Sequence, residues 1–100
     1  MKTREILAIS KMGCVAQSTC GAMHLCTGQL HFTFSRSELI RFIDFLNKAM
    51  DDMKTVHGYN KLFIATGIAQ MQIVLSMQEV DALIDLLNEA ELAVAVKEIL

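Results

Sequence analysis

The sequence predicts an α+β fold of two layers: an antiparallel sheet built from two ββα repeats, two helices on one face, and N-terminal strands that extend the sheet. The first observation is an internal repeat. A shift of 41 positions aligns residues 35–49 with residues 76–90 and gives seven identities in fifteen positions, where unrelated segments share about one. The second is the Ser-x-x-Glu sequence that opens both copies, which is the capping box of a helix. The third is the apolar run directly before each of these serines, which is typical of a strand.

Length and composition indicate a folded chain without a basic or membrane-spanning character. The 100 residues are 53% hydrophobic and 20% charged, and the formal net charge is −2. We expect one domain, divided into N-terminal strands (1–21), a first ββα unit (22–54) and a second unit (61–100). The scattered Lys and Arg argue against nucleic-acid binding, and no apolar run reaches the ~18–20 residues of a membrane helix. We therefore expect a cytoplasmic protein with reduced cysteines.

The first third of the chain predicts two short strands. Residues 6–9 are all apolar, which favours a strand, and residues 14–17 are expected to return beside them after a turn at residues 11–13. A short helix in place of the first strand is an open alternative. Residues 18–21 are small and polar, and they predict the next turn.

Residues 23–34 predict an antiparallel hairpin, because apolar side chains alternate on both sides of Thr27-Gly28-Gln29. One face is then apolar and consists of Met23, Leu25, Leu30, Phe32 and Phe34. The other face carries His24, Cys26, His31 and Thr33. If the turn is Thr27-Gly28, His24 lies opposite His31, whereas a turn one residue later places Cys26 opposite His31.

Both capping boxes are followed by apolar residues at helical spacing. The first helix is expected to begin after Ser35 and to place an apolar stripe on the sheet. In the second unit, residues 62–65 and 71–75 predict strands, and a helix follows Ser76 with an apolar stripe of the same spacing. This helix is expected to continue through the apolar residues 92–100.

His24, Cys26 and His31 are the candidate chemical residues. Imidazole and thiolate are the ligands that zinc prefers, and one strand face brings the three together. A fourth ligand would be Cys14, Cys20 or water. The alternatives are a thiol nucleophile with a histidine base and a polar strand face that binds nothing. No pair of cysteines has the short spacing of zinc fingers, and no phosphate-loop, dinucleotide or catalytic-triad motif is present.

The helices carry more apolar surface than one sheet contact requires. The excess consists of Ile40, Phe45, Leu86 and the tail at 92–100. Such a surface predicts a homodimer or a protein partner. The sequence thus favours a non-enzymatic self-associating or protein-interaction module with no cofactor, and the alternative function is a zinc- or thiol-dependent site at His24, Cys26 and His31.

The run Cys20-Gly21-Ala22-Met23-His24-Leu25-Cys26-Thr27-Gly28-Gln29-Leu30-His31-Phe32-Thr33-Phe34-Ser35, with the capped helix after it, resembles a hairpin in a family of small uncharacterised single-domain proteins of the Bacteroidota. The likeness covers about a third of the chain. It implies a bacterial cytoplasmic protein, and it assigns no role to any residue.

Overall fold

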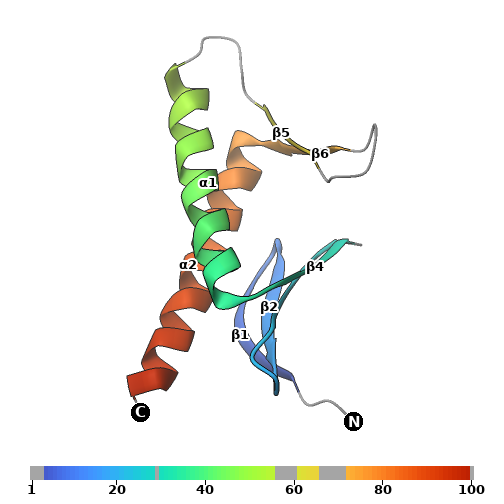
Figure 1. Ribbon diagram of the computed structural model, residues 1–100. Helices are drawn as coiled ribbons and strands as arrows, with labels where there is room; N and C mark the ends of the chain where they lie inside the picture. The colour runs from blue at the N-terminus through green and yellow to red at the C-terminus, as the bar shows by residue number, and fades with distance from the viewer. Residues whose placement is uncertain (1–3, 29, 56–60, 66–71, 100) are drawn as a thin grey trace.

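The computed structural model describes residues 4–28, 30–55, 61–65 and 72–99, which form six strands and two helices (Figure 1). The elements in chain order are β1 (Arg4–Ser10), β2 (Gly13–Ser18), β3 (Met23–Thr27), β4 (Leu30–Phe34), α1 (Arg36–Thr55), β5 (Lys61–Ala65), β6 (Gln72–Ser76) and α2 (Met77–Ile99). Strands β1 to β4 form one antiparallel sheet in sequential order, and β5 and β6 form a separate hairpin. The α+β class predicted from the sequence is therefore confirmed.

The first sheet is a meander with a bulge in its first strand. Residues 4–10 form a strand, so the helical alternative at this position is wrong. Ile6 pairs with Ala16 and Ala8 with Val15, so that Leu7 is the extra residue and reaches toward the core. A bulge of this kind increases the local twist of a strand. Gly21, with φ of 91°, and the bond from the Ser18 amide to the Ala22 carbonyl close the turn between β2 and β3.

The register of β3 and β4 decides between the two turns that the sequence allowed. Thr27 pairs with Leu30 and Cys26 with His31, so the turn lies one residue later than Thr27-Gly28. Gly28 has φ of 57°, a conformation that costs little only for glycine. His24 consequently lies opposite Thr33 and not opposite His31.

Both capping boxes are present as predicted. The Ser35 amide donates to Glu38 Oε1 at 2.9 Å, and the Glu38 amide donates to Ser35 Oγ at 3.2 Å. The same pair of bonds joins Ser76 and Glu79, at 2.9 and 3.1 Å. Each box satisfies two amides that the first helical turn leaves without a partner. Each helix thus begins directly at the end of a strand.

The core lies between α2 and the elements around it. Helix α2 contacts β1, β2, β5, β6 and α1, while α1 contacts β4 and β5. The buried apolar side chains of the core are Ala8, Val15, Met23, Leu25, Leu39, Ile43, Leu46, Met50, Val80, Leu83, Ile84, Leu86, Leu87, Ala90 and Val94. Leu86 is 1% exposed, so its assignment to the excess surface is wrong: α2 has partners on more than one side and buries a wider stripe. Ile40 and Phe45 are exposed as expected.

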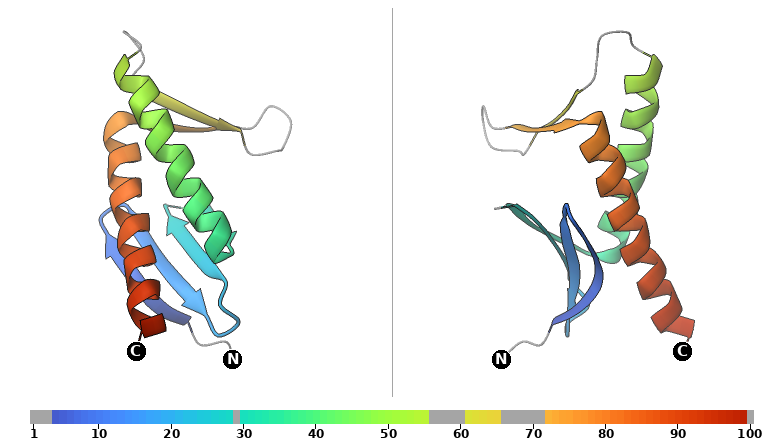
Figure 2. Two further views of the ribbon diagram at one scale, coloured as in Figure 1. Left: turned by 60° about the vertical axis from the view of Figure 1, so that its left-hand side comes forward. Right: turned by 180° about the vertical axis from the view of Figure 1, so that it is seen from behind.

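The described strands form two sheets and not the one continuous sheet that the sequence predicts. Both sheets lie on the same side of the helix pair, at different heights along it (Figures 1 and 2). The 23 residues of α2 span about 34 Å at 1.5 Å per residue. This length lets the four-stranded sheet pack near the C-terminal half of α2 while the β5–β6 hairpin stays at its N-terminal end, so the two never meet as neighbouring strands.

Candidate functional site

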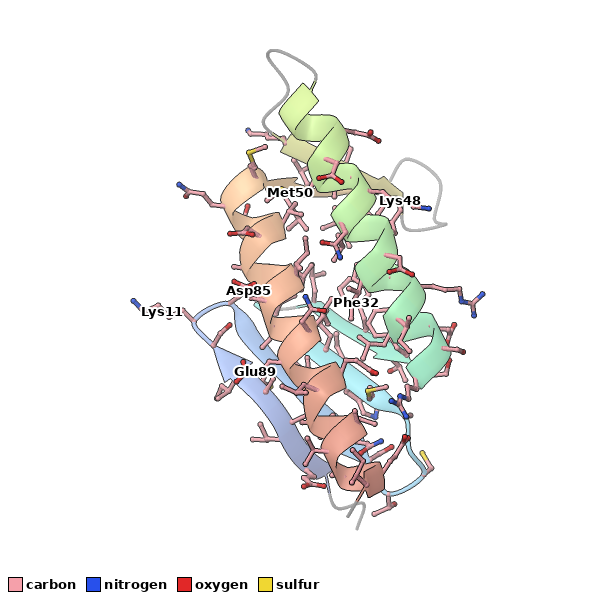
Figure 3. The ribbon with its side chains drawn as sticks, turned by 90° about the vertical axis from the view of Figure 1, so that its left-hand side faces the viewer. Lys11, Phe32, Lys48, Met50, Asp85 and Glu89 are labelled. Atoms are coloured by element: carbon pink, nitrogen blue, oxygen red, sulfur yellow. The ribbon has the colours of Figure 1, made fainter. Side chains whose placement is uncertain are left out.

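An open apolar cleft separates the β5–β6 hairpin from the first sheet. Its volume is about 460 Å³. The lining residues come from β3, β4, β5, β6 and both helices: Met12, Leu25, Thr27, Gly28, Leu30, Phe32, Phe34, Phe42, Ile64, Ile73, Val74, Leu75, Glu79 and Leu83. Phe32 of β4 lies behind the helix pair in the view of Figure 3 and packs against the core. The cleft is therefore continuous with the hydrophobic core and opens between the two sheets.

A row of four phenylalanines runs from the cleft to the surface of α1. The ring centroids are 6.3 Å apart for Phe32 and Phe34, 5.4 Å for Phe34 and Phe42, and 6.3 Å for Phe42 and Phe45. Neighbouring rings are nearly parallel, and such pairs contribute about 0.5–1.5 kcal/mol each beyond their burial. Phe45, the last ring, is 46% exposed. The row gives one wall of the cleft a rigid aromatic surface that reaches solvent.

The β5–β6 hairpin forms the opposite wall, and each of its two faces carries apolar side chains. Leu62, Ile64 and Leu75 turn one face toward the core. Phe63 and Val74 are paired on the other face and are 52% and 46% exposed. A hairpin of two strands is marginally stable unless something covers it.

Strand β4 forms the edge of the first sheet that is nearest the cleft. Its described residues pair with β3 alone, so its second side presents backbone donors and acceptors without a strand neighbour. Edges of this kind are ready to pair with a further strand. Leu30, at the start of β4, is exposed beside the cleft. The sequence shows the apolar strands, but it does not show that an edge and a hairpin face each other.

Four of the five predicted ligands, His24, His31, Cys14 and Cys26, lie on the outer face of the first sheet. Cys14, Cys26 and His31 are neighbours across β2, β3 and β4 and make one cross-strand row. His24 Nδ1 is 2.9 Å from His31 Nε2, and the ring centroids are 5.1 Å apart. The two imidazoles thus meet diagonally, although their residues are not paired in the register.

The remaining cysteine lies apart from this row. Cys20, in the turn after β2, has its sulfur 3.0 Å from Ser18 Oγ. Cys14 and Cys26 are free thiols. Within the described residues, no three His, Cys, Asp or Glu side chains are close enough to hold a metal ion as they stand. Cys14, one of the predicted fourth ligands, is paired with Cys26 across β2 and β3.

Charged side chains tie the start of α1 to the end of α2. Arg36 Nη2 contacts Glu91 Oε1 at 3.1 Å, and Arg36 Nη1 contacts Glu98. Hydrogen bonds to Glu91, and to a smaller extent to Glu98, raise the pKa of Arg36 above its ordinary value. Lys97 contacts Glu5 of β1 and donates to Gln17 Oε1 at 3.2 Å. These contacts hold the end of α2 over the first sheet, far along the helix from the cleft.

Together these features define a small α+β protein with an apolar cleft between a strand edge and an exposed hairpin. The chain belongs to the family of unknown function DUF6686, whose sequence profile matches residues 1–99. Comparison with curated proteins gives no match, and neither does comparison with solved structures. Within the described part of the chain, neither helix has the length and apolar character needed to cross a membrane.

Proposed function

We propose that this protein is a non-enzymatic self-associating module that works as a homodimer. The observation that carries the proposal is the large accessible surface area of the chain. The accessible area is 6916 Å², whereas a folded monomer of 11.1 kDa exposes about 5,700 Å². The excess of about 1,200 Å² exceeds the ~800 Å² that each partner buries in a standard interface.

The shape and the exposed side chains support the same proposal. The radius of gyration is 14.3 Å, compared with about 13 Å for a compact domain of 100 residues. The large hydrophobic side chains that are exposed among the described residues are Ile6, Ile9, Leu30, Ile40, Phe45, Phe63, Val74, Leu92, Val96 and Ile99. Exposed apolar side chains that gather into a patch mark association sites in soluble proteins. A second copy or another protein partner would cover it.

We infer a bacterial cytoplasmic setting, in the Bacteroidota. The likeness of residues 20–35 to proteins of that group supports this assignment, as do Cys14 and Cys26, which remain free thiols. We also infer that the two ββα units descend from one duplicated unit. The seven identities between residues 35–49 and 76–90 and the matching capping boxes support the duplication.

The test is the molar mass of the purified chain, measured by light scattering over a series of protein concentrations. We expect twice 11.1 kDa at high concentration, and an unfolding midpoint that rises with concentration because only the folded state dimerises. A well-folded chain with a mass of 11.1 kDa at every concentration would contradict the proposal.

A second candidate function is a zinc- or thiol-dependent site on the outer face of the first sheet. The observation that favours it is the 2.9 Å approach of His24 to His31, beside the cross-strand row of Cys14, Cys26 and His31. Two imidazoles and two thiolates are a complete tetrahedral zinc set. Side-chain rotation of the cysteines would have to complete the site, because no three of these groups converge as they stand.

Metal analysis of the purified protein tests this candidate. Near-stoichiometric zinc that is lost from the His24→Ala and His31→Ala variants would support it. Cys20→Ala is the matched control, because Cys20 lies in the turn after β2 and outside the row, and it should retain the metal. Absence of zinc after refolding with excess zinc would reject the site.

A further inference from the structure

The proposed self-association leaves open which surface is used, and two exposed apolar surfaces can be compared. The α2 stripe consists of Leu92, Val96 and Ile99, which share one helix face in its last turns. Glu89 and Asp85 continue the same face toward the N-terminus. The stripe therefore offers three apolar side chains, and the next residues on the same helix face are charged. A standard interface involves about 20–30 residues on each side.

The cleft offers a larger and less charged surface, and Lys61 is the one charged residue in the described strands of the hairpin. Fourteen described residues line the cleft, and Glu79 is the single charged residue among them. Leu30 and Val74 are exposed at the cleft, and Phe45 and Phe63 extend the apolar surface outward from it. Depletion of charge with enrichment of aromatic side chains is the composition of an interface core.

The two polar side chains among the described residues of the cleft already make hydrogen bonds within the chain, and this argues against a small-molecule ligand. Thr27 Oγ1 donates to the Met12 carbonyl at 3.0 Å. Glu79 Oε1 accepts from the Ser76 amide at 2.9 Å. Pockets for small molecules orient their ligands with a few polar groups directed inward, and these two side chains are committed to the turn and to the helix cap. An apolar protein surface needs no such groups.

The surface also has the shape that a two-fold dimer requires. A two-fold contact uses the same patch on both chains, so the patch must be complementary to itself. Here one patch contains both a hollow, the cleft, and a projection, because the β5–β6 strands extend away from the helix pair (Figure 2). Besides the pairing of its own strands, the hairpin contacts the two helices, and the described residues of β4 pair with β3 alone.

We propose that a second copy of this chain closes the cleft, in a two-fold dimer whose contact is formed by the cleft and the β5–β6 hairpin of each chain. Phe63 and Val74 of one copy lie against the cleft of the other, and the reverse contact follows by symmetry. The edge of β4 then gains hydrogen-bond partners from the second copy. This inference rests on the proposed self-association and specifies its surface.

The test compares glutamate substitutions on the two apolar surfaces by light scattering and by the Kd obtained on dilution. Phe63→Glu and Val74→Glu should each raise the dimer Kd at least tenfold, because a buried unpaired carboxylate opposes association. Leu92→Glu and Val96→Glu, the matched controls on the α2 stripe, should leave the Kd within about threefold of the wild-type value. All four side chains are exposed in one chain, so the monomer should still fold, and circular dichroism verifies this.

Hydrogen exchange gives a readout that does not depend on a variant. In the wild-type dimer the amides of β4 should exchange at least tenfold more slowly than in the diluted monomer. The inference alone fails if the wild-type chain dimerises but only the α2-stripe variants weaken the dimer, or if β4 gains no protection. A monomeric wild-type chain would overturn both the proposed self-association and the proposed dimer contact. Native mass spectrometry that detects a monomer with a bound apolar small molecule would overturn them as well.

Discussion

Gly13 is a position where the structure predicts a large effect from adding one carbon atom. A Cβ built on Gly13 would overlap the carbonyl oxygen of Cys26, and it would lie 3.0 Å from both the Cys26 carbonyl carbon and the Thr27 Cα. These atoms belong to the backbone of β3, so no flexible side chain can move aside. Gly13→Ala must therefore push β2 away from β3.

The magnitude follows from what this separation breaks. Relief of the overlap requires a shift on the order of 1 Å, which disrupts the pairing of Cys14 with Cys26 and the 3.0 Å bond from Thr27 Oγ1 to the Met12 carbonyl. Two lost hydrogen bonds, at about 1 kcal/mol each, and residual backbone strain of about 1 kcal/mol give a loss of about 3 kcal/mol. Typical domains have about 5–15 kcal/mol of total stability.

Gly28→Ala is the matched control. Among the described residues, no atom lies within 4 Å of a Cβ at Gly28, but φ is +57°. This variant therefore has backbone strain without a clash and should lose about 1 kcal/mol. Urea unfolding of both variants, at one protein concentration, measures the difference. Equal losses of unfolding free energy, or a smaller loss for Gly13→Ala, would refute the reasoning that the clash between β2 and β3 is the main cause of the destabilisation.

Two further predictions concern the helix ends. Hydrogen bonds from Ser35, chiefly from its amide and to a smaller extent from its hydroxyl, hold the pKa of Glu38 below its ordinary value. The charged carboxylate therefore stabilises the folded state. This contribution is complete above the unfolded pKa of about 4.3 and is lost as the pH falls through the lowered value. Glu38→Gln should therefore destabilise the protein at pH 6, with a deficit that shrinks toward pH 3; a constant deficit in urea unfolding would contradict this. Arg36→Met should lower the thermal midpoint by removing the contacts to Glu91 and Glu98, and because these groups are partly exposed, the loss should shrink between about 0.05 and 0.5 M salt. A loss that is independent of salt would show that packing of the Arg36 side chain is responsible.

Much of the fold follows from local patterns in the sequence. The capping boxes at Ser35 and Ser76 and the alternation in residues 23–34 identify the helix starts and the hairpin, because these signals depend on neighbours within a few residues. The α+β class follows from them. The sequence also singled out His24 and His31, which do meet on one sheet face, although the pattern left their register open between two turns.

The candidate cleft was not predictable in the same way. Its walls come from β3, β4, β5, β6 and both helices, and no short pattern links these segments. The repeat favoured one continuous sheet, whereas the described strands form two. Leu86 has the same apolar character as Leu92, yet the first is buried and the second is exposed, because burial depends on what lies across from each helix face.

The sequence alone therefore determined the elements of this protein. It showed where the helices begin and that apolar residues are in excess. It also predicted the pairing of the first hairpin, with two possible registers that differ by one residue. Capping, alternation and glycine turns are local interactions, and short stretches of chain specify them. The tertiary structure decided how far apart along α2 the two sheets pack, and hence that β4, which pairs with β3 alone among the described strands, faces an exposed hairpin across an apolar cleft. That arrangement depends on the length of α2 and on contacts between residues distant in the chain, which local patterns do not encode.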